Sequence, residues 1–174
     1  MDSDVTDVEM QTEEGRTPET AAFEEFFLET NRGLFGALWL VTRNCHEAEE
    51  IAQDAYLKVW ERWDQVGSLD DPVGYLHRTA MNVWRSRGRR AAVALRKVVH
   101  QIGAGRDDLA DVESRDAVIV ALAGLTPRQR AAIVLTDLLD MTSEDAAKAL
   151  GVRASTVRVL SARARASLKE GMKR

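Results

Sequence analysis

The chain has 174 residues, of which 45% are hydrophobic and 30% charged, with a formal net charge of −4, and such a chain folds as one medium domain or two small ones. The sequence has only three prolines and few aromatic residues, a composition that disfavours a β-sandwich or barrel. Its single cysteine, Cys45, excludes an intramolecular disulfide framework. Because the sequence contains no signal-peptide pattern and no apolar run near the roughly 20 residues of a membrane span, we expect a cytoplasmic protein without membrane insertion.

The placement of the charges is more informative than their sum. Residues 1–22 contain seven acidic residues and one arginine, whereas residues 116–174 contain ten lysines and arginines and six acidic residues. Residues 1–20 also lack apolar periodicity, which predicts a disordered acidic tail. The basic C-terminal end is therefore compatible with a nucleic-acid partner despite the negative total.

The first module is predicted to span residues 21–90, with a first helix from near Ala21 and a second over His46–Trp63. One side of the second helix is apolar, and the opposite side is acidic with a leucine among the charges. A leucine in such a place suits docking to a basic partner, while a merely solvated face is the alternative. The residues of this candidate docking face are Glu50, Gln53, Asp54 and Leu57.

A third helix is predicted to start at Pro72 with Asp71 as its N-cap and to end in the basic cluster 85–90. Its spacing i, i+4, i+7, i+11 places three arginines and one amide on one outer face. Arginine binds phosphate and asparagine can pair with an adenine edge, so this face is a candidate nucleic-acid surface. Its members are Arg78, Asn82, Arg85 and Arg89. Tyr75 and Trp84 are candidates for base stacking, with core packing as the alternative and the one favoured for Trp84.

Residues 91–115, with Gly103 and Gly105, are predicted to form a flexible linker, and periodicity resumes over residues 116–174. Thr126-Pro127-Arg128-Gln129 is a capping box, and Thr142 caps the short helix that follows. Gly151 is the expected left-handed cap between that helix and the last one. A short helix, a glycine turn and a longer helix indicate a helix-turn-helix.

The last helix has two faces of different character. Val157, Leu160, Ala164 and Leu168 form one narrow apolar stripe, predicted to pack inward. The opposite face combines small side chains with arginines, which suits the major groove, whereas an ordinary solvated basic face is the alternative. Its candidate DNA-binding residues are Ser155, Thr156, Arg158, Val159, Ala162 and Arg163.

These elements predict an all-α fold of two small helical domains joined by a flexible linker. The histidines are scattered, and no H-E-x-x-H, C-x-x-C or P-loop spacing occurs, so we expect no enzyme, no metal site and no cofactor. A conventional helix-turn-helix regulator with an unrelated N-terminal partner domain is the alternative function. The basic face of the third helix argues against that alternative.

Four segments carry a family resemblance: AEEIAQDAYLKVWERWDQV (48–66), DDPVGYLHRTAMNVWRSRGRR (70–90), LTPRQRAAIVL (125–135) and SEDAAKALGVRASTVRVLSARARASL (143–168). The motif D-P-x-x-Y-L-x-R followed by A-x-N-x-x-R, and L-x-P-R-Q-R before a helix-turn-helix, are its most specific parts. This combination resembles the extracytoplasmic-function (ECF) group of sigma-70-type RNA polymerase sigma factors, in an actinobacterial-looking subgroup. Sigma factors of this group keep only the sigma-2 and sigma-4 domains.

The resemblance implies a sigma-2-like domain over 21–90, a linker over 91–115 and a sigma-4-like domain over 116–174. It implies core RNA polymerase as partner, with the acidic docking face of residues 50–57 on the clamp helices and a further contact to the flap. Promoter DNA would bind as duplex at the minus-thirty-five element and as melted strands at the minus-ten element. The loop Asp64–Asp70 would hold a flipped base, the linker would thread toward the active-site cleft, and an anti-sigma factor would be a further partner.

Two positions depart from the family pattern. Thr136-Asp137 stands where the family often has Arg-Tyr, and Val159-Leu160 replaces a more usual polar pair in the recognition helix. Val159 can still contact a thymine methyl group.

Overall fold

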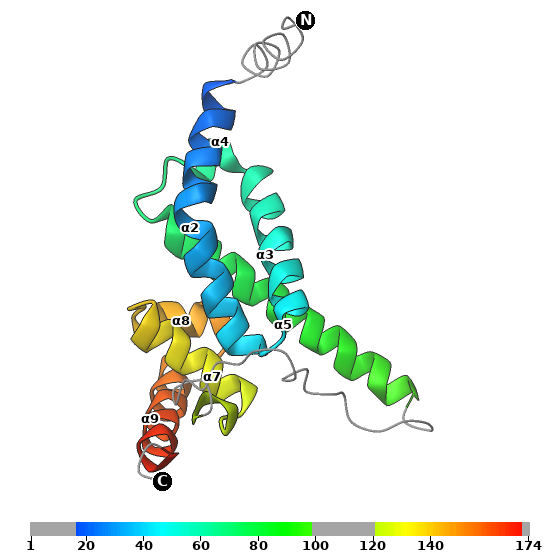
Figure 1. Ribbon diagram of the computed structural model, residues 1–174, viewed down its shortest axis with the longest axis vertical. Coiled ribbons are helices and arrows are strands. Elements are labelled where there is room, and N and C mark those ends of the chain that lie inside the picture. The colour runs from blue at the N-terminus through cyan, green and yellow to red at the C-terminus, as the bar shows by residue number, and fades with distance from the viewer. Residues whose placement is uncertain (1–16, 99–120, 172–174) are drawn as a thin grey trace, which may run out of the picture.

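The computed structural model describes residues 17–98 and 121–171, and every regular element in these two ranges is helical. The all-α prediction is confirmed by these elements. None of the helices in the described ranges is long and apolar enough to cross a membrane. The N-terminal module contains α2 (Pro18–Thr42), α3 (Cys45–Trp60), α4 (Trp63–Val66) and α5 (Pro72–Val98), and the C-terminal module contains α7 (Pro127–Ile133), the π-helical turn η1 (Val134–Leu138), α8 (Ser143–Leu150) and α9 (Ala154–Gly171) (Figure 1).

Side-chain caps fix where most of these helices begin. Asp71 Oδ1 accepts a hydrogen bond from the Gly74 amide at 2.7 Å, and Pro72 occupies the first turn of α5, as predicted. The Thr126–Gln129 capping box is present in both directions at the start of α7. Each cap satisfies amides that the first turn of a helix leaves without a partner.

Three boundaries differ from the sequence prediction. The second helix, α3, ends at Trp60, and Trp63 begins the separate turn α4. Residues 18–20, assigned to the acidic tail, begin α2 with Thr17 as N-cap. Residues 91–98, assigned to the linker, continue α5, while 1–16 and 99–120 lie outside the described residues.

The core of the N-terminal module lies where α2, α3 and α5 meet, and its fully buried side chains include Leu34, Leu38, Ile51 and Leu76. Phe23 of α2 packs on Trp60 and Trp63 with ring centroids 4.8 and 5.2 Å away. These aromatic contacts close the end of the α2–α3 pair remote from the C-terminal module (Figure 1).

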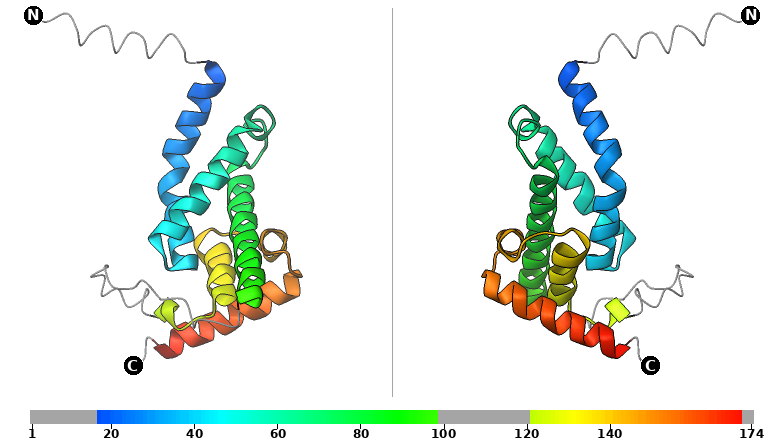
Figure 2. Two further views of the ribbon diagram at one scale, coloured as in Figure 1. Left: turned by 90° about the vertical axis from the view of Figure 1, so that its right-hand side faces the viewer. Right: turned by 90° about the vertical axis from the view of Figure 1, so that its left-hand side faces the viewer.

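The two modules pack directly on each other. Helix α5 lies against α8, α2 lies against α7 and η1, and one continuous buried cluster includes residues of both modules (Figure 2). The Arg130 guanidinium, only 7% exposed, donates from Nε to the Val41 carbonyl at 3.2 Å and from Nη1 to the Leu125 carbonyl at 3.1 Å. One arginine thus ties the start of the C-terminal module to the last turn of α2.

Candidate nucleic-acid and protein interfaces

The outer face of α3 presents an apolar side chain to solvent. Leu57 is 60% exposed, and Gln53 beside it is exposed as well. Both line a groove of about 720 Å³ between α2 and α3, together with Phe23, Phe27 and Trp60. The Trp60 side chain is 41% exposed at this groove. An open apolar groove beside an exposed leucine is a surface suited to a partner protein.

The two carboxylates predicted for the same face are already engaged inside the protein. Arg87 of α5 donates to Glu50 at 2.5 Å and to Asp54 at 2.8 Å. These hydrogen bonds raise the pKa of Arg87 above its ordinary value. Glu50 and Asp54 therefore help to hold α3 on α5, whereas Gln53 and Leu57, the other two residues predicted for docking, are exposed. Sequence reasoning missed Arg87, because nothing in its spacing identifies a partner on another helix.

The predicted nucleic-acid face of α5 is divided. Asn82 and Arg89 are exposed, but Arg78 and Arg85 are half-buried and turned toward the C-terminal module. Arg85 Nη1 donates to Asn82 Oδ1 and to the Ala149 carbonyl of α8, both at 3.0 Å. The helical spacing puts these four residues on one side of α5. In the whole molecule, α8 covers half of that face.

The two aromatic side chains predicted as candidates for base stacking pack against the core. Tyr75 and Trp84 are half-buried and pack against the core, so the core role favoured for Trp84 agrees with the structure. The segment Asp64–Asp70 begins as α4, anchored by buried Val66, and ends in exposed residues that include Leu69, 44% exposed. Its tip is accessible to a ligand.

The last helix, α9, presents the predicted face to solvent. Ser155, Thr156, Arg158, Val159, Ala162 and Arg163 are all exposed. Val157 and Ala164 are fully buried on the opposite side, where Leu160 and Leu168 are partly buried. Ser161 is buried too, at 2% exposure, which the sequence prediction missed. Gly151, before this helix, has the left-handed φ of 60° expected of it.

Two ion pairs join α9 to the elements that precede it, one to α8 and one to η1. Arg158 Nη1 donates to Glu144 of α8 at 3.1 Å. Arg165 donates from two nitrogens to both oxygens of Asp137, each at 2.7 Å, and this lowers the pKa of Asp137. Thr136 also lies 3.1 Å from Ser161 through their hydroxyl oxygens. The unusual Thr136-Asp137 pair thus has partners on α9 in this chain.

Comparisons with known proteins point to one family. The model "Sigma-70 region 2" matches residues 26–93 and "Sigma-70, region 4" matches residues 115–168. The chain is 34% identical over 152 residues to the ECF RNA polymerase sigma factor SigM of Mycobacterium tuberculosis, covering 84% of this chain and 75% of that protein. It is 29% identical over 154 residues to the RNA polymerase sigma-E factor of Streptomyces avermitilis, covering 87% of this chain and 86% of that protein.

Solved structures share the fold. The sigma factor RpoE of Bartonella quintana, in complex with the anti-sigma factor NepR, matches with a TM-score of 0.66 at 24% identity, over 87% of this chain and 96% of that one. CnrH in complex with the cytosolic domain of CnrY matches with a TM-score of 0.57 at 24% identity, over 94% of both chains. At this identity the likeness concerns the fold.

Proposed function

Because this chain belongs to the ECF group of sigma-70-type RNA polymerase sigma factors, we propose that it uses the outer face of α3 to dock on core polymerase and the faces of α5 and α9 to bind promoter DNA. Its role is that of a sigma factor in transcription initiation. On the basis of the family resemblance, we propose that the α3 face binds the clamp helices and that the protein acts in the cytoplasm together with core polymerase. An anti-sigma factor is a further proposed partner, since the similar RpoE structure is a complex with the anti-sigma factor NepR. The similar CnrH structure is a complex with the cytosolic domain of CnrY.

The upstream promoter element is proposed to contact α9. Small exposed side chains at Ser155 and Ala162 let the helix approach the floor of the major groove, and Arg158 and Arg163 flank them. The buried stripe on the opposite side keeps this face turned outward. Val159, 49% exposed, offers an apolar contact to a thymine methyl group.

The downstream element is proposed to contact α5 through Asn82, Arg85 and Arg89, with Arg78 at the start of the face. While α8 lies on this helix, Arg85 is held by the Ala149 carbonyl. Full use of the face therefore requires α8 to move away. We propose that the factor opens on its way to the promoter complex.

The exposed leucine of α3 is the observation that carries the polymerase proposal. An apolar anchor truncated at the centre of an interface costs about 1–2 kcal/mol or more. We expect Leu57→Ala to weaken binding to core polymerase by roughly tenfold, measured by titrating labelled factor with core enzyme. Leu28→Ala is the matched control, because Leu28 is 77% exposed on α2 and outside the groove. Equal affinities of the two variants would remove the docking proposal.

A further inference from the structure

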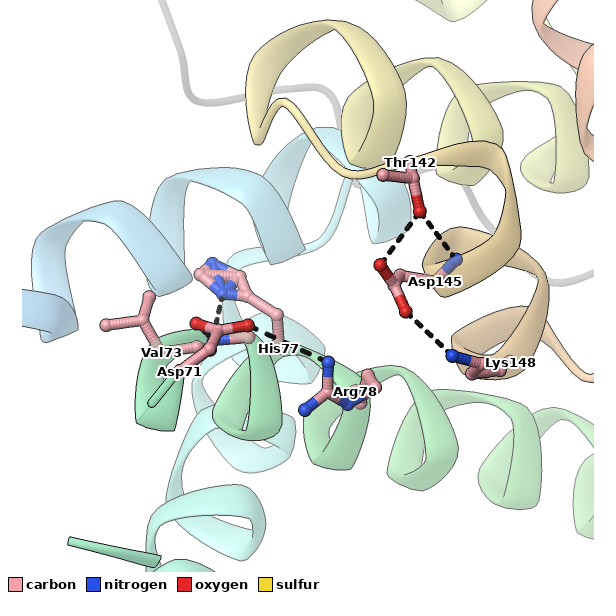
Figure 3. Close-up of polar contacts among 8 residues, drawn as sticks. Asp71, Val73, His77, Arg78, Thr142, Asp145 and Lys148 are labelled. Atoms are coloured by element: carbon pink, nitrogen blue, oxygen red, sulfur yellow. Dashed lines mark hydrogen bonds and ion pairs between the residues drawn. The ribbon is translucent and has the colours of Figure 1, made fainter. Parts of the chain in front are cut away.

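A cavity of about 260 Å³ lies at the joint between the modules, between the first turns of α5 and the segment that enters α8. The α5 side contributes Asp71, His77 and Arg78, and the C-terminal side contributes Asp140, Thr142 and Asp145. Figure 3 shows Arg78 between Asp71 and the start of α8, with the His77 imidazole on the same helix. The joint thus contains His77, a titratable residue that has no part in the proposed function.

The His77 imidazole is buried at this joint with half of its hydrogen-bonding capacity unused. The side chain is 7% exposed, and Nδ1 lies 3.4 Å from the Val73 carbonyl. Nε2 is buried without a hydrogen-bond partner among the described residues. A neutral ring tolerates this with one unpaired nitrogen, whereas a protonated ring would bury an unpaired N–H donor together with a charge.

Two of the three carboxylates that line the cavity form hydrogen bonds or ion pairs with other groups. Asp71 accepts from the Gly74 amide and lies 3.8 Å from Arg78. Asp145 accepts from the Thr142 hydroxyl at 2.8 Å and from Lys148 at 3.0 Å (Figure 3). Asp140, the remaining acid, is exposed at the cavity edge. Asp71 and Asp145 therefore already have partners other than the imidazole.

The balance of these effects favours the neutral imidazole. Burial lowers the pKa of His77, Asp71 opposes this by raising it, and Arg78 lowers it further. Part of that burial comes from the C-terminal module, since the segment before α8 forms the other wall of the cavity. Separation of the modules would hydrate the ring and return its pKa toward about 6.5.

We infer that His77 is an acid-sensitive latch: the neutral ring lets the C-terminal module close over α5, and protonation of the ring favours the open arrangement that frees Arg78 and Arg85. The consequence for promoter access rests on the proposed function of α5, but the opening itself does not.

The sign of the pH dependence follows from proton uptake on opening. The closed state has the lower His77 pKa, so opening binds a proton at pH values between that pKa and about 6.5. The closed state is favoured above about pH 6.5, and its population decreases as the pH falls. One linked proton changes the ratio of closed to open molecules by at most about tenfold per pH unit.

Energy transfer between the modules in the full chain tests the latch. The two dyes are attached to exposed Cys45 and to a second thiol introduced at exposed Ser167 (Ser167→Cys). All variants carry His100→Gln, which removes the one histidine that lies outside the described residues. Transfer should fall between pH 7.5 and 5.5 at constant helical circular dichroism. His77→Leu should abolish this fall, and His46→Gln should retain it, because the His46 side chain is 83% exposed. A flat profile before mutation, or an unchanged one in His77→Leu, overturns the latch.

A titration of the imidazole resonances by NMR covers the case in which His77→Leu does not fold. The pKa of His77 should lie below about 6.5, the ordinary value for histidine, in the unmutated protein and should move toward that value in Arg85→Ala, which removes the bond to the Ala149 carbonyl. A His77 pKa at the ordinary value in the unmutated protein, or one that stays low in Arg85→Ala, overturns the latch. If acid opens the modules without improving binding of unpaired minus-ten DNA, the latch stands and the proposed role of α5 fails.

Discussion

Among individual side chains, Arg158 and Asn82 occupy the positions where DNA recognition can be tested most directly. Arg158 forms an ion pair with Glu144, and both side chains are about 60% exposed. An exposed pair of this kind contributes about 0–1 kcal/mol, so Arg158 can exchange Glu144 for a base or a phosphate at little cost. Asn82 is exposed and accepts one hydrogen bond from Arg85, which leaves its amide NH₂ available.

Arg158→Ala is expected to weaken binding to an upstream-element duplex by about 1–3 kcal/mol and to relax specificity at one base pair, because bidentate contact to guanine is lost. Fluorescence anisotropy at fixed salt measures both effects. Glu144→Gln is the matched control: it removes the same ion pair but keeps the arginine, so affinity should be maintained or rise. An equal loss on all duplex sequences would reduce Arg158 to a phosphate contact.

Asn82→Ala is expected to slow open-complex formation while upstream duplex binding is retained. The reason is that an amide on α5 gains base contacts only after the strands separate. Holoenzyme on a template already unpaired in the minus-ten segment should recover part of the loss, as measured by the yield of transcript. Arg158→Ala should show no such recovery. Intact open-complex formation together with reduced duplex binding would contradict the assignment of α5 and favour an ordinary regulator.

At the scale of secondary-structure elements, the turn between α8 and α9 has both a local and a tertiary constraint. Gly151 has a φ of 60°, a backbone conformation that residues with a Cβ adopt at a cost of about 1–2 kcal/mol. An added Cβ would also stand 2.1 Å from the Arg85 guanidinium. The glycine therefore ends α8 and permits the close approach of α5.

Gly151→Ala is expected to lower the free energy of unfolding by about 1 kcal/mol or more and to loosen α8 from α5. Urea denaturation followed by circular dichroism gives the value. Gly36→Ala is the matched control, because Gly36 lies inside α2 with no heavy atom near the added Cβ. That variant should gain roughly 0.5–1 kcal/mol. Equal effects at the two sites would contradict the assigned role of the left-handed turn.

At the scale of the whole molecule, the two modules are in direct contact and are not two independent domains joined only by a linker. Arg130 donates across the contact to the Val41 carbonyl, Arg85 donates to Ala149, and Arg43 donates to Ala123 at 3.4 Å. Three arginines thus bind main-chain carbonyls of the opposite module. Helical ends supply such carbonyls, because their last turns lack intrahelical donors.

Arg130→Met is expected to lower the melting temperature and to separate the unfolding of the two modules into distinct calorimetric transitions. The substitution leaves buried carbonyls without their donor, at a cost of about 1–3 kcal/mol per group. Arg128→Met is the matched control, since Arg128 is exposed two residues earlier in α7 and its substitution should change stability by less than about 0.5 kcal/mol. A single unshifted transition in Arg130→Met would show that the modules do not depend on this contact.

Local signals in the sequence were sufficient for the helices and for the exposed face of α9. The caps at Asp71, Thr126 and Thr142 and the turn at Gly151 all have the predicted geometry. Each depends on residues within three or four positions of one another, so the chain specifies them without knowledge of the fold. The inward stripe of α9 follows from helical periodicity in the same way.

The tertiary structure alone decided which side chains of these faces are available. Arg87 binds Glu50 and Asp54, which lie 33 or more positions away in sequence, and Arg85 binds the Ala149 carbonyl, 64 positions away. Helix α8 also covers one side of α5. Helical periodicity states which residues share a face but not which other helix covers that face. That choice depends on how the two modules bury their apolar surfaces together, and it placed His77 and two of the proposed DNA-binding arginines at a closed joint.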